Sequence, residues 1–226
     1  MHSFEDAMET NTIQAVIFDF DGTLYDFAHL PRNLILSRPL DMFLMKAERT
    51  VRRACKGRDF KTSDALMSEF TRAMSELSKK SHEKIEVWYK TRYIQTMIRV
   101  LSKKYTARRG TAELFEALHK NGIKIAVFSD YPCVRERMSA IGLGSEAQNT
   151  CAVITSAQER GAFKPASRPF LEIAAELGVK SEQCLVVGDR ADTDGKGAEL
   201  SGMRFLQIES NAPSFETAEF LSQIER

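Results

Sequence analysis

Two aspartates stand two residues apart at the end of an apolar run in the segment AVIFDFDGTLYD, residues 15–26. Burying a carboxylate is unfavourable unless a partner compensates its charge. Side chains two positions apart on an extended backbone project to the same side, so Asp19 and Asp21 can act on one bound molecule. One carboxylate can then attack an electrophile while the other transfers a proton. The segment therefore predicts a reaction centre at the end of a buried strand.

Three other apolar runs are also followed by polar side chains. These are Ser129 with Asp130, then Lys164, and then Asp189, Asp192 and Asp194 of the sequence GDRADTD. Four or more carboxylates in one place repel one another, and a divalent cation resolves that conflict. Mg²⁺ suits a site built from oxygen ligands, retained water and a substrate phosphate. The strand-end segments contain no histidine, which argues against zinc.

This set of side chains predicts phosphoryl transfer. Asp19 is expected to attack phosphorus and form an aspartyl-phosphate. Asp21 is expected to protonate the leaving oxygen and then to deprotonate the water that cleaves the intermediate. Lys164, as a point charge, and the Ser129 hydroxyl would offset the charge on the phosphoryl oxygens.

The elements that must position these side chains follow from the hydrophobic pattern. Five short apolar runs predict strands buried on both faces, at 14–19, 123–129, 151–155, 184–189 and 203–208. Helical patterns separate most of them, at 111–122, 134–144, 165–178 and 195–203. This alternation predicts an α/β fold with a Rossmann-like, three-layer core around a parallel sheet. Ligands of such sheets bind at the carboxyl ends of the strands, where all the polar side chains above would meet.

Residues 27–104 break the alternation of strands and helices. They contain no convincing strand, and the segments 39–56, 62–80 and 82–104 have helical periodicity. In the first of these segments, Leu40, Phe43, Leu44, Ala47 and Val51 are an example of apolar residues at helical spacing. We therefore expect an all-helical domain over 27–104, inserted into an α/β core made of 1–26 and 105–226. The hinges between the two domains are expected at 24–28 and 104–110.

Basic residues are concentrated in the insert. Between residues 38 and 109 there are 19 Lys and Arg against 8 Asp and Glu, which leaves 13 against 23 elsewhere. Such an excess is typical of solvated helix faces, but it also suits a positive field over an anion-binding site. The candidates by charge alone are Arg49, Arg52 and Arg53, together with Lys90 and Arg92.

Four motifs in this order resemble those of the haloacid dehalogenase-like hydrolase superfamily: DFDGTLYD, the strand-end Ser129, the pair Lys164-Pro165, and GDRADTD. The resemblance covers the whole α/β part, and the insert lies where this superfamily has its helical, C1-type cap. It implies Asp19 as the nucleophile and Asp21 as the general acid and base. It also implies Mg²⁺ held by Asp19, the Asp21 backbone carbonyl and Asp189, with Asp194 in support. The substrate phosphate would be contacted by Thr23, Ser129, Asp130 and Lys164.

Within this superfamily, the aspartate at position 21 resembles the pattern of phosphatases, whereas dehalogenase members lack it. We therefore expect hydrolysis of a small soluble phosphomonoester. One departure is visible, because the superfamily often has asparagine after the second-motif hydroxyl and this chain has Asp130. A carboxylate turned inward would weaken binding of an anionic substrate, whereas contact through its backbone alone would not.

Two other functions share these motifs. A phosphotransferase or sugar-phosphate mutase would pass the phosphoryl group to a hydroxyl instead of water, a choice made by the cap and by water exclusion. A non-catalytic ligand-binding module would retain the acidic site without turnover. The intact set of Asp19, Asp21, Ser129, Lys164 and Asp189 speaks against such a module.

Composition sets the remaining expectations. With 226 residues, 43% hydrophobic and 28% charged, the chain is typical of globular proteins. No apolar run approaches the ~20 residues that cross a bilayer, and the start MHSFEDAMETNT lacks the pattern of a signal peptide. The four cysteines are scattered without metal-type spacing. We expect a cytoplasmic protein that binds a small phosphorylated molecule and neither nucleic acid nor membrane; oligomeric state leaves no mark in the sequence.

Overall fold

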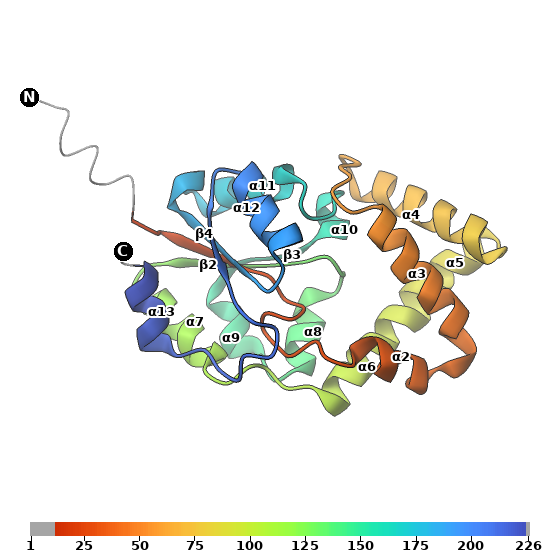
Figure 1. Cartoon of the computed structure of the whole chain (residues 1–226), viewed down its shortest axis with the longest axis horizontal. Coiled ribbons are helices and arrows are strands. Elements are labelled where there is room, and N and C mark those ends of the chain that lie inside the picture. Colours follow the sequence, from red (N-terminus) through yellow and green to blue (C-terminus); the bar gives the residue numbers. More distant parts are fainter. Residues whose placement is uncertain (1–11, 225–226) are drawn as a thin grey trace, which may run out of the picture.

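A five-stranded parallel sheet forms the centre of the protein in the computed structural model, which describes residues 12–224 (Figure 1). The strands are β1 (Ala15–Phe18), β2 (Lys124–Ser129), β3 (Cys151–Ser156), β4 (Cys184–Gly188) and β5 (Arg204–Gln207). Their order across the sheet is β3-β2-β1-β4-β5, and every neighbouring pair is parallel. The predicted α/β fold with a parallel sheet is confirmed.

Helices cover both faces of the sheet. They are α7 (Thr111–Lys120), α8 (Val134–Ala140), α9 (Ser145–Asn149), α10 (Ala157–Arg160), α11 (Ser167–Leu177), α12 (Lys196–Leu200) and α13 (Thr217–Ile224). In Figure 1, α11 and α12 lie on one side of the sheet and α7, α8, α9 and α13 on the other. Phe18 of β1 packs on Phe115 of α7 with ring centres 5.1 Å apart, and Phe128 of β2 packs on Phe170 of α11 at 5.2 Å. The apolar core therefore lies in two layers, one on each face.

Burial decreases from the centre of the sheet to its edges. Every residue of β1 is buried, as expected for a strand with two neighbours and helices on both faces. The prediction that all five strands are buried was wrong for β5, whose residues are half-buried or exposed, and for the middle of β3. Both are edge strands with a single neighbour, so less of their surface is covered.

The helical insert lies between β1 and β2 in the chain and beside the sheet in space (Figure 1). Its helices are α2 (Leu30–Ser37), α3 (Met42–Ala54), α4 (Ser63–Ser78), α5 (His82–Trp88) and α6 (Ile94–Lys104). A π-helical turn, Tyr89–Tyr93, joins the last two. Helix α2 was not predicted. No helix among residues 12–224 is long and apolar enough to cross a membrane.

The apolar pattern predicted for the first helix of the insert was partly wrong. Leu44, Ala47 and Val51 of α3 are buried at positions i, i+3 and i+7, as expected. Leu40 and Phe43 are instead 99% and 59% exposed. The residues Pro39–Asp41 form a separate 3₁₀ turn, and α3 begins only at Met42. Leu40 therefore lies outside α3, whereas Phe43 belongs to α3 and precedes its first buried position, Leu44.

The insert is joined to the sheet side by the loop between α3 and α4. The amide of Phe60 donates to the carbonyl of Gly161 at 2.8 Å, and the amide of Gly57 donates to the carbonyl of Lys164 at 3.0 Å. Asp59 also pairs with Arg168 at 2.8 Å. These contacts hold the C-terminal end of α3 close to the carboxyl end of β3.

Candidate active site

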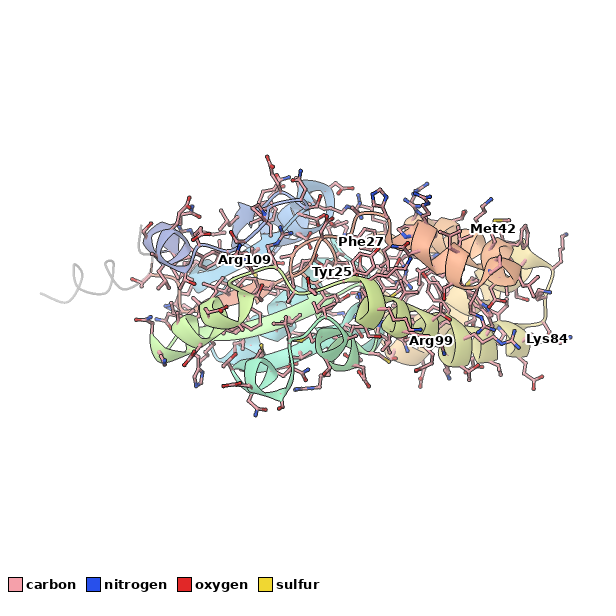
Figure 2. All side chains as sticks on the ribbon, turned by 90° about the horizontal axis from the view of Figure 1, so that it is seen from below. Tyr25, Phe27, Met42, Lys84, Arg99 and Arg109 are labelled. Atoms are coloured by element: carbon pink, nitrogen blue, oxygen red, sulfur yellow. The ribbon has the colours of Figure 1, made fainter. Side chains whose placement is uncertain are left out.

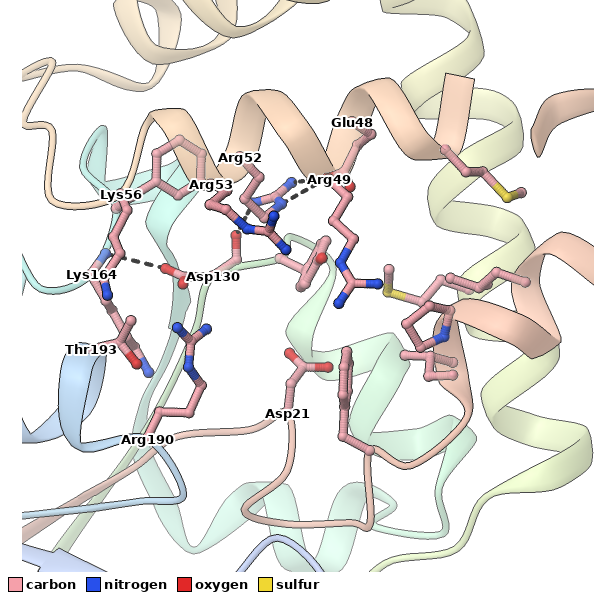
Figure 3. A pocket seen from close by; sticks show the side chains of 18 of the residues that line it. Asp21, Glu48, Arg49, Arg52, Arg53, Lys56, Asp130, Lys164, Arg190 and Thr193 are labelled. Atoms are coloured by element: carbon pink, nitrogen blue, oxygen red, sulfur yellow. Dashed lines mark hydrogen bonds and ion pairs between the residues drawn. The ribbon is translucent and has the colours of Figure 1, made fainter. Parts of the chain in front are cut away.

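A cavity of about 580 Å³ lies between the carboxyl edge of the sheet and the insert (Figure 3). Its lining on the sheet side includes six of the predicted site residues: Asp19, Asp21, Asp130, Lys164, Asp189 and Asp194. They come from the segments after β1, β2, β3 and β4, which the parallel topology brings to one edge. Residues of α2, α3 and α6 line the opposite walls.

Asp19 directly follows β1 and is held by two donors. The Lys164 Nζ donates to its Oδ1 at 2.6 Å, and the Thr23 hydroxyl donates to its Oδ2 at 3.0 Å. Burial raises the pKa of Asp19 well above its usual value, although Lys164 acts in the opposite direction. Burial also lowers the pKa of Lys164, but Asp19 and Asp194 outweigh this effect and leave that pKa above its usual value. Lys164 is therefore a buried, charged lysine shared by two carboxyl groups.

Asp21 has a different set of partners. The Tyr25 hydroxyl donates to its Oδ1 at 2.5 Å, and the Ser129 hydroxyl donates to its Oδ2 at 2.9 Å. Arg137 forms an ion pair with the same carboxylate and also donates to the Ser129 hydroxyl at 2.9 Å. Figure 3 shows Asp21 facing the cavity from its loop. Three donors therefore fix the orientation of this carboxylate.

The carboxylates of Asp19, Asp189 and Asp194 suit a divalent cation. One ligand atom from each of them lies within 4.8 Å of the others. The Oδ1 atom of Asp189 is buried and has no hydrogen-bond partner within residues 12–224. Burial, and then the charge of Asp194, raises the pKa of Asp189 to about 6. An all-oxygen donor set with an unsatisfied buried oxygen is what Mg²⁺ requires.

Gly22 makes room for this cluster. Its φ is +94°, and a Cβ at this position would lie 2.3 Å from Oδ2 of Asp189. Any other residue would therefore be strained in its backbone and would also displace a carboxylate of the cluster. Gly22 therefore allows the turn after the two aspartates and also leaves room for the Asp189 carboxylate.

Asp130 is tied into the loops around the site. Its Oδ1 accepts from the backbone amide of Lys164 at 3.2 Å, and burial raises its pKa. Its backbone carbonyl accepts from Nη1 of Arg52 at 2.8 Å. The guanidinium of Arg52 also lies 3.9 Å from the ring centre of Tyr131 and bonds Glu48 at 2.7 Å. The side chain of Asp130 thus connects the loop after β2 with the loop that carries Lys164, while its backbone carbonyl contacts the insert.

The structure separates the predicted site residues into two groups. Six line the cavity, as given above. Thr23 and Ser129 are fully buried behind the two aspartates and do not line it, so their contact with phosphate stays a prediction. The Asp21 backbone carbonyl as a metal ligand also stays a prediction. Asp192 is exposed and pairs with Arg190 at 2.8 Å and with Lys56.

Sequence reasoning missed Tyr25 and Arg137. Arg137 is the largest fully buried side chain within residues 12–224. A signal for it exists, since Val134, Arg137 and Met138 share the buried face of α8 at positions i, i+3 and i+4. A charged residue on an apolar face must find a partner inside the protein. No comparable pattern singles out Tyr25, which reaches Asp21 through the turn of the loop.

The basic residues of the insert that were candidates for anion binding differ in their positions and partners. All three arginines of α3 line the cavity, but Arg52 is paired with Glu48 and donates to the Asp130 carbonyl. Lys90 pairs with Glu86 at 2.6 Å and does not line the cavity. Arg92 lies at a second surface pocket.

Comparisons with known proteins identify the family of the chain. The family model described as haloacid dehalogenase-like hydrolase matches residues 13–202. Over 91 residues the chain is 35% identical to "Glyceraldehyde 3-phosphate phosphatase" of Methanopyrus kandleri, strain AV19. That alignment covers 40% of this chain and 38% of the relative, so the chain matches well under half of the relative's length.

Solved structures share the fold across nearly the whole chain. One is described as a predicted phosphoglycolate phosphatase from Haemophilus somnus 129pt, with a TM-score of 0.59 and 20% identity, covering 93% of this chain and 97% of that one. Another is a 2-haloacid dehalogenase from Pseudomonas syringae pv. Tomato DC3000, with a TM-score of 0.62 and 18% identity, covering 94% and 97%. At these identities the likeness concerns the fold and does not select the reaction.

Proposed function

The chain belongs to the haloacid dehalogenase-like hydrolase family, and on that premise we propose that it is a Mg²⁺-dependent phosphatase of a small phosphomonoester. The observation that carries the proposal is the pair Asp19 and Asp21 at one wall of the cavity, each with different partners. Two carboxylates in different environments can take two different roles. The curated relative named as a phosphatase supports the same reaction class.

In the first step, a carboxylate oxygen of Asp19 attacks phosphorus and the bond between phosphorus and the leaving oxygen breaks. Asp21 supplies the proton that the leaving alcohol needs. In the second step, Asp21 takes a proton from water, the water oxygen attacks phosphorus, and the bond from Asp19 to phosphorus breaks. Thr23 and Lys164 hold Asp19 in place for the attack, and Lys164 offsets negative charge on the phosphoryl oxygens.

Asp19, Asp189 and Asp194 would hold Mg²⁺, with the backbone carbonyl of Asp21 as a further ligand. The ion, when bound, offsets charge on the carboxylates and on the substrate phosphate. The buried Oδ1 of Asp189 supports this assignment, because no donor within the described residues bonds it and it is therefore free to bind an ion.

We propose that the insert, residues 27–104, is a cap that opens to admit substrate and closes to exclude bulk water. The two proposed hinges, 24–28 and 104–110, lie side by side. The amide of Arg108 donates to the carbonyl of Leu24 at 2.8 Å, and the rings of Tyr25 and Tyr105 lie 5.6 Å apart. A motion at these hinges would act next to Tyr25, which contacts Asp21.

Phosphate release from a panel of small phosphomonoesters, with and without Mg²⁺, tests the proposal. Asp19→Asn is the control, since an amide does not act as the nucleophile. We expect Mg²⁺-dependent release that falls at least about a thousandfold in the variant, the order lost with a nucleophile. Release that persists in Asp19→Asn would overturn the mechanism.

Turnover in ¹⁸O-labelled water separates hydrolysis from transfer to another hydroxyl. A hydrolase places one labelled oxygen in the released phosphate, because water cleaves the aspartyl-phosphate. A mutase or phosphotransferase would give a phosphorylated product without the label. That result would assign the chain to the transferases and contradict hydrolysis.

A further inference from the structure

Lys46, Arg49 and Arg53 form a basic face of α3 that borders the cavity. They occupy positions i, i+3 and i+7, which lie on one side of a helix. Within residues 12–224, the side-chain nitrogens of these three residues take part in no ion pair and no hydrogen bond. Figure 3 shows Arg49 and Arg53 extending from α3 toward the cavity, with Asp21 on the facing side. We call this group the α3 basic face.

The other basic side chains that line the cavity are paired with acids of the chain. Arg52 pairs with Glu48 at 2.6 Å, and Lys164 pairs with Asp19 and Asp194 at 2.6 and 2.8 Å. Like charges four residues apart destabilise a helix, yet Arg49 and Arg53 have that spacing. The positive charge of the α3 basic face is therefore a surplus that this part of the chain leaves for a ligand.

An apolar wall stands beside the α3 basic face. It consists of Phe27, Leu30 and Leu34 with Met45 and Met97, from α2, α3, α6 and the segment before α2. The cavity of about 580 Å³ equals the volume of roughly twenty water molecules at about 30 Å³ each. A phosphate group and one or two carbons would leave most of this space unfilled. The cavity therefore has room for a larger organic part.

We propose that the substrate is a phosphomonoester whose organic part carries a second anionic group, bound by Arg49 and Arg53, and an apolar segment packed on the wall of α2 and α6. The inference rests on the proposed phosphatase function, since the first phosphate is placed at Asp19. A guanidinium binds a carboxylate and a phosphate through the same two parallel hydrogen bonds. The second anion can therefore be of either kind.

The test uses phosphate monoesters of straight-chain alcohols with three, six or eight carbons. Each length is prepared with a terminal methyl, carboxylate or phosphate group, so that only the charge of the far end changes. We expect kcat/KM to be at least about tenfold higher for an anionic end than for the methyl end at six or eight carbons. Comparing the carboxylate with the phosphate series identifies which anion the site takes.

The double variant Arg49→Gln/Arg53→Gln is expected to lose this preference, so that its kcat/KM for the anionic ends falls to the value that the same variant has for the methyl ends. The matched control is Arg99→Gln, which removes an exposed arginine of α6 outside the cavity (Figure 2). The control should keep the full preference. Equal kcat/KM for anionic and methyl ends, or a preference that survives in the double variant, would overturn the inference.

A binding experiment tests this inference independently of the proposed phosphatase function. Phosphonate analogues of the same series, which no phosphatase cleaves, are titrated into wild type and double variant by calorimetry in the presence of Mg²⁺. Tighter binding of anionic ends in the wild type alone supports the inference even if no ester is hydrolysed. No difference between the ends overturns it, whatever the turnover experiments show.

Discussion

At the scale of single residues, the two aspartates after β1 differ in what surrounds them. Asp19 lies between a buried lysine and a threonine hydroxyl, in the cluster suited to Mg²⁺. Asp21, two residues later, lies in a cage of Tyr25, Ser129 and Arg137. The same residue type can then serve as a nucleophile at one position and move protons at the other.

Replacing Arg137 is predicted to reduce turnover through the position of Asp21. Arg137→Met leaves a carboxylate without its ion-pair partner, and breaking a buried pair in this way costs about 3–5 kcal/mol of stability. Because Arg137 lies behind Asp21 and does not line the cavity, we expect kcat to fall about ten- to a hundredfold with little change in KM. Steady-state kinetics with a thermal melt measures both effects.

Arg135→Gln is the matched control for that variant, since Arg135 is an exposed arginine of the same helix. It should leave kcat and the melting temperature unchanged. Arg137→Lys restores a charge without the planar fork and should recover part of the kcat. A large rise in KM at constant kcat in Arg137→Met would contradict a positioning role.

The raised pKa of Asp189 predicts how the Mg²⁺-free protein responds to pH. Its folded pKa of about 6, raised by burial and then by Asp194, lies above the usual 3.8. Between these two values the folded state binds more protons than the unfolded state, so the free energy of unfolding falls as pH rises through this range. The loss is complete once the pH lies well above 6.

Urea unfolding in EDTA at pH 4.5 and pH 7.5 checks this prediction, with Asp189→Asn as a reference that cannot titrate. The stability of wild type relative to the variant should drop by about 1–2 kcal/mol toward pH 7.5, after allowance for solvent screening. A relative stability that is constant or rises with pH would contradict the assignment.

At the scale of elements, α3 joins the insert to the core in two places. Arg52 reaches the carbonyl of Asp130 after β2, and Lys56, just past the helix, pairs with Asp192 after β4. The first contact is shielded by the ring of Tyr131, whereas the second is exposed. The exposed contact is the weaker one, since ion pairs in water contribute about 0–1 kcal/mol.

Asp192→Asn is predicted to loosen the contact between the insert and the core. Its ion pairs with Arg190 and Lys56 lower the pKa of Asp192 to about 2, so the carboxylate stays charged throughout pH 5–8. We expect KM to rise about two- to fivefold, the equivalent of up to about 1 kcal/mol, with kcat nearly unchanged. The effect should shrink at 1 M NaCl, where exposed charges are screened.

Kinetics at low and high salt measures this effect, and Glu209→Gln, at another exposed acid, is the control. A KM equal to that of the wild type at low salt would show that the pair with Lys56 does not contribute to closure.

At the scale of the whole molecule, Mg²⁺ is predicted to stabilise the fold. The candidate metal site gathers residues that follow β1 and β4, so an ion bound there would link segments that are far apart in the chain. With a Kd of about 0.1 mM, 10 mM Mg²⁺ would add about 2.7 kcal/mol. For a chain of this size the melting temperature would rise by about 5–10 °C.

Thermal melts with MgCl₂, and with NaCl at the same ionic strength, test this prediction. The rise should be specific to Mg²⁺ and absent in Asp189→Asn. An equal rise with NaCl would indicate screening of surface charge and no specific site.

The sequence by itself determined the class of fold and the acidic side of the site. Uninterrupted apolar runs separated by helical patterns require a parallel sheet with covered faces. The carboxyl ends of parallel strands meet at one edge, so Asp19, Asp189 and Lys164 could be brought together from their positions after three runs. These inferences succeed because period and strand direction are local properties of the chain.

Only the tertiary structure decided the partners. The ion pair between Asp21 and Arg137 joins a loop to a helix 116 positions later, and no local pattern specifies that distance. The same holds for Arg49 and Arg53, which the sequence could not distinguish from Arg52 on one helix. Whether a charge is paired or left for a ligand depends on what the folded chain places opposite it, and this is a property of the packing.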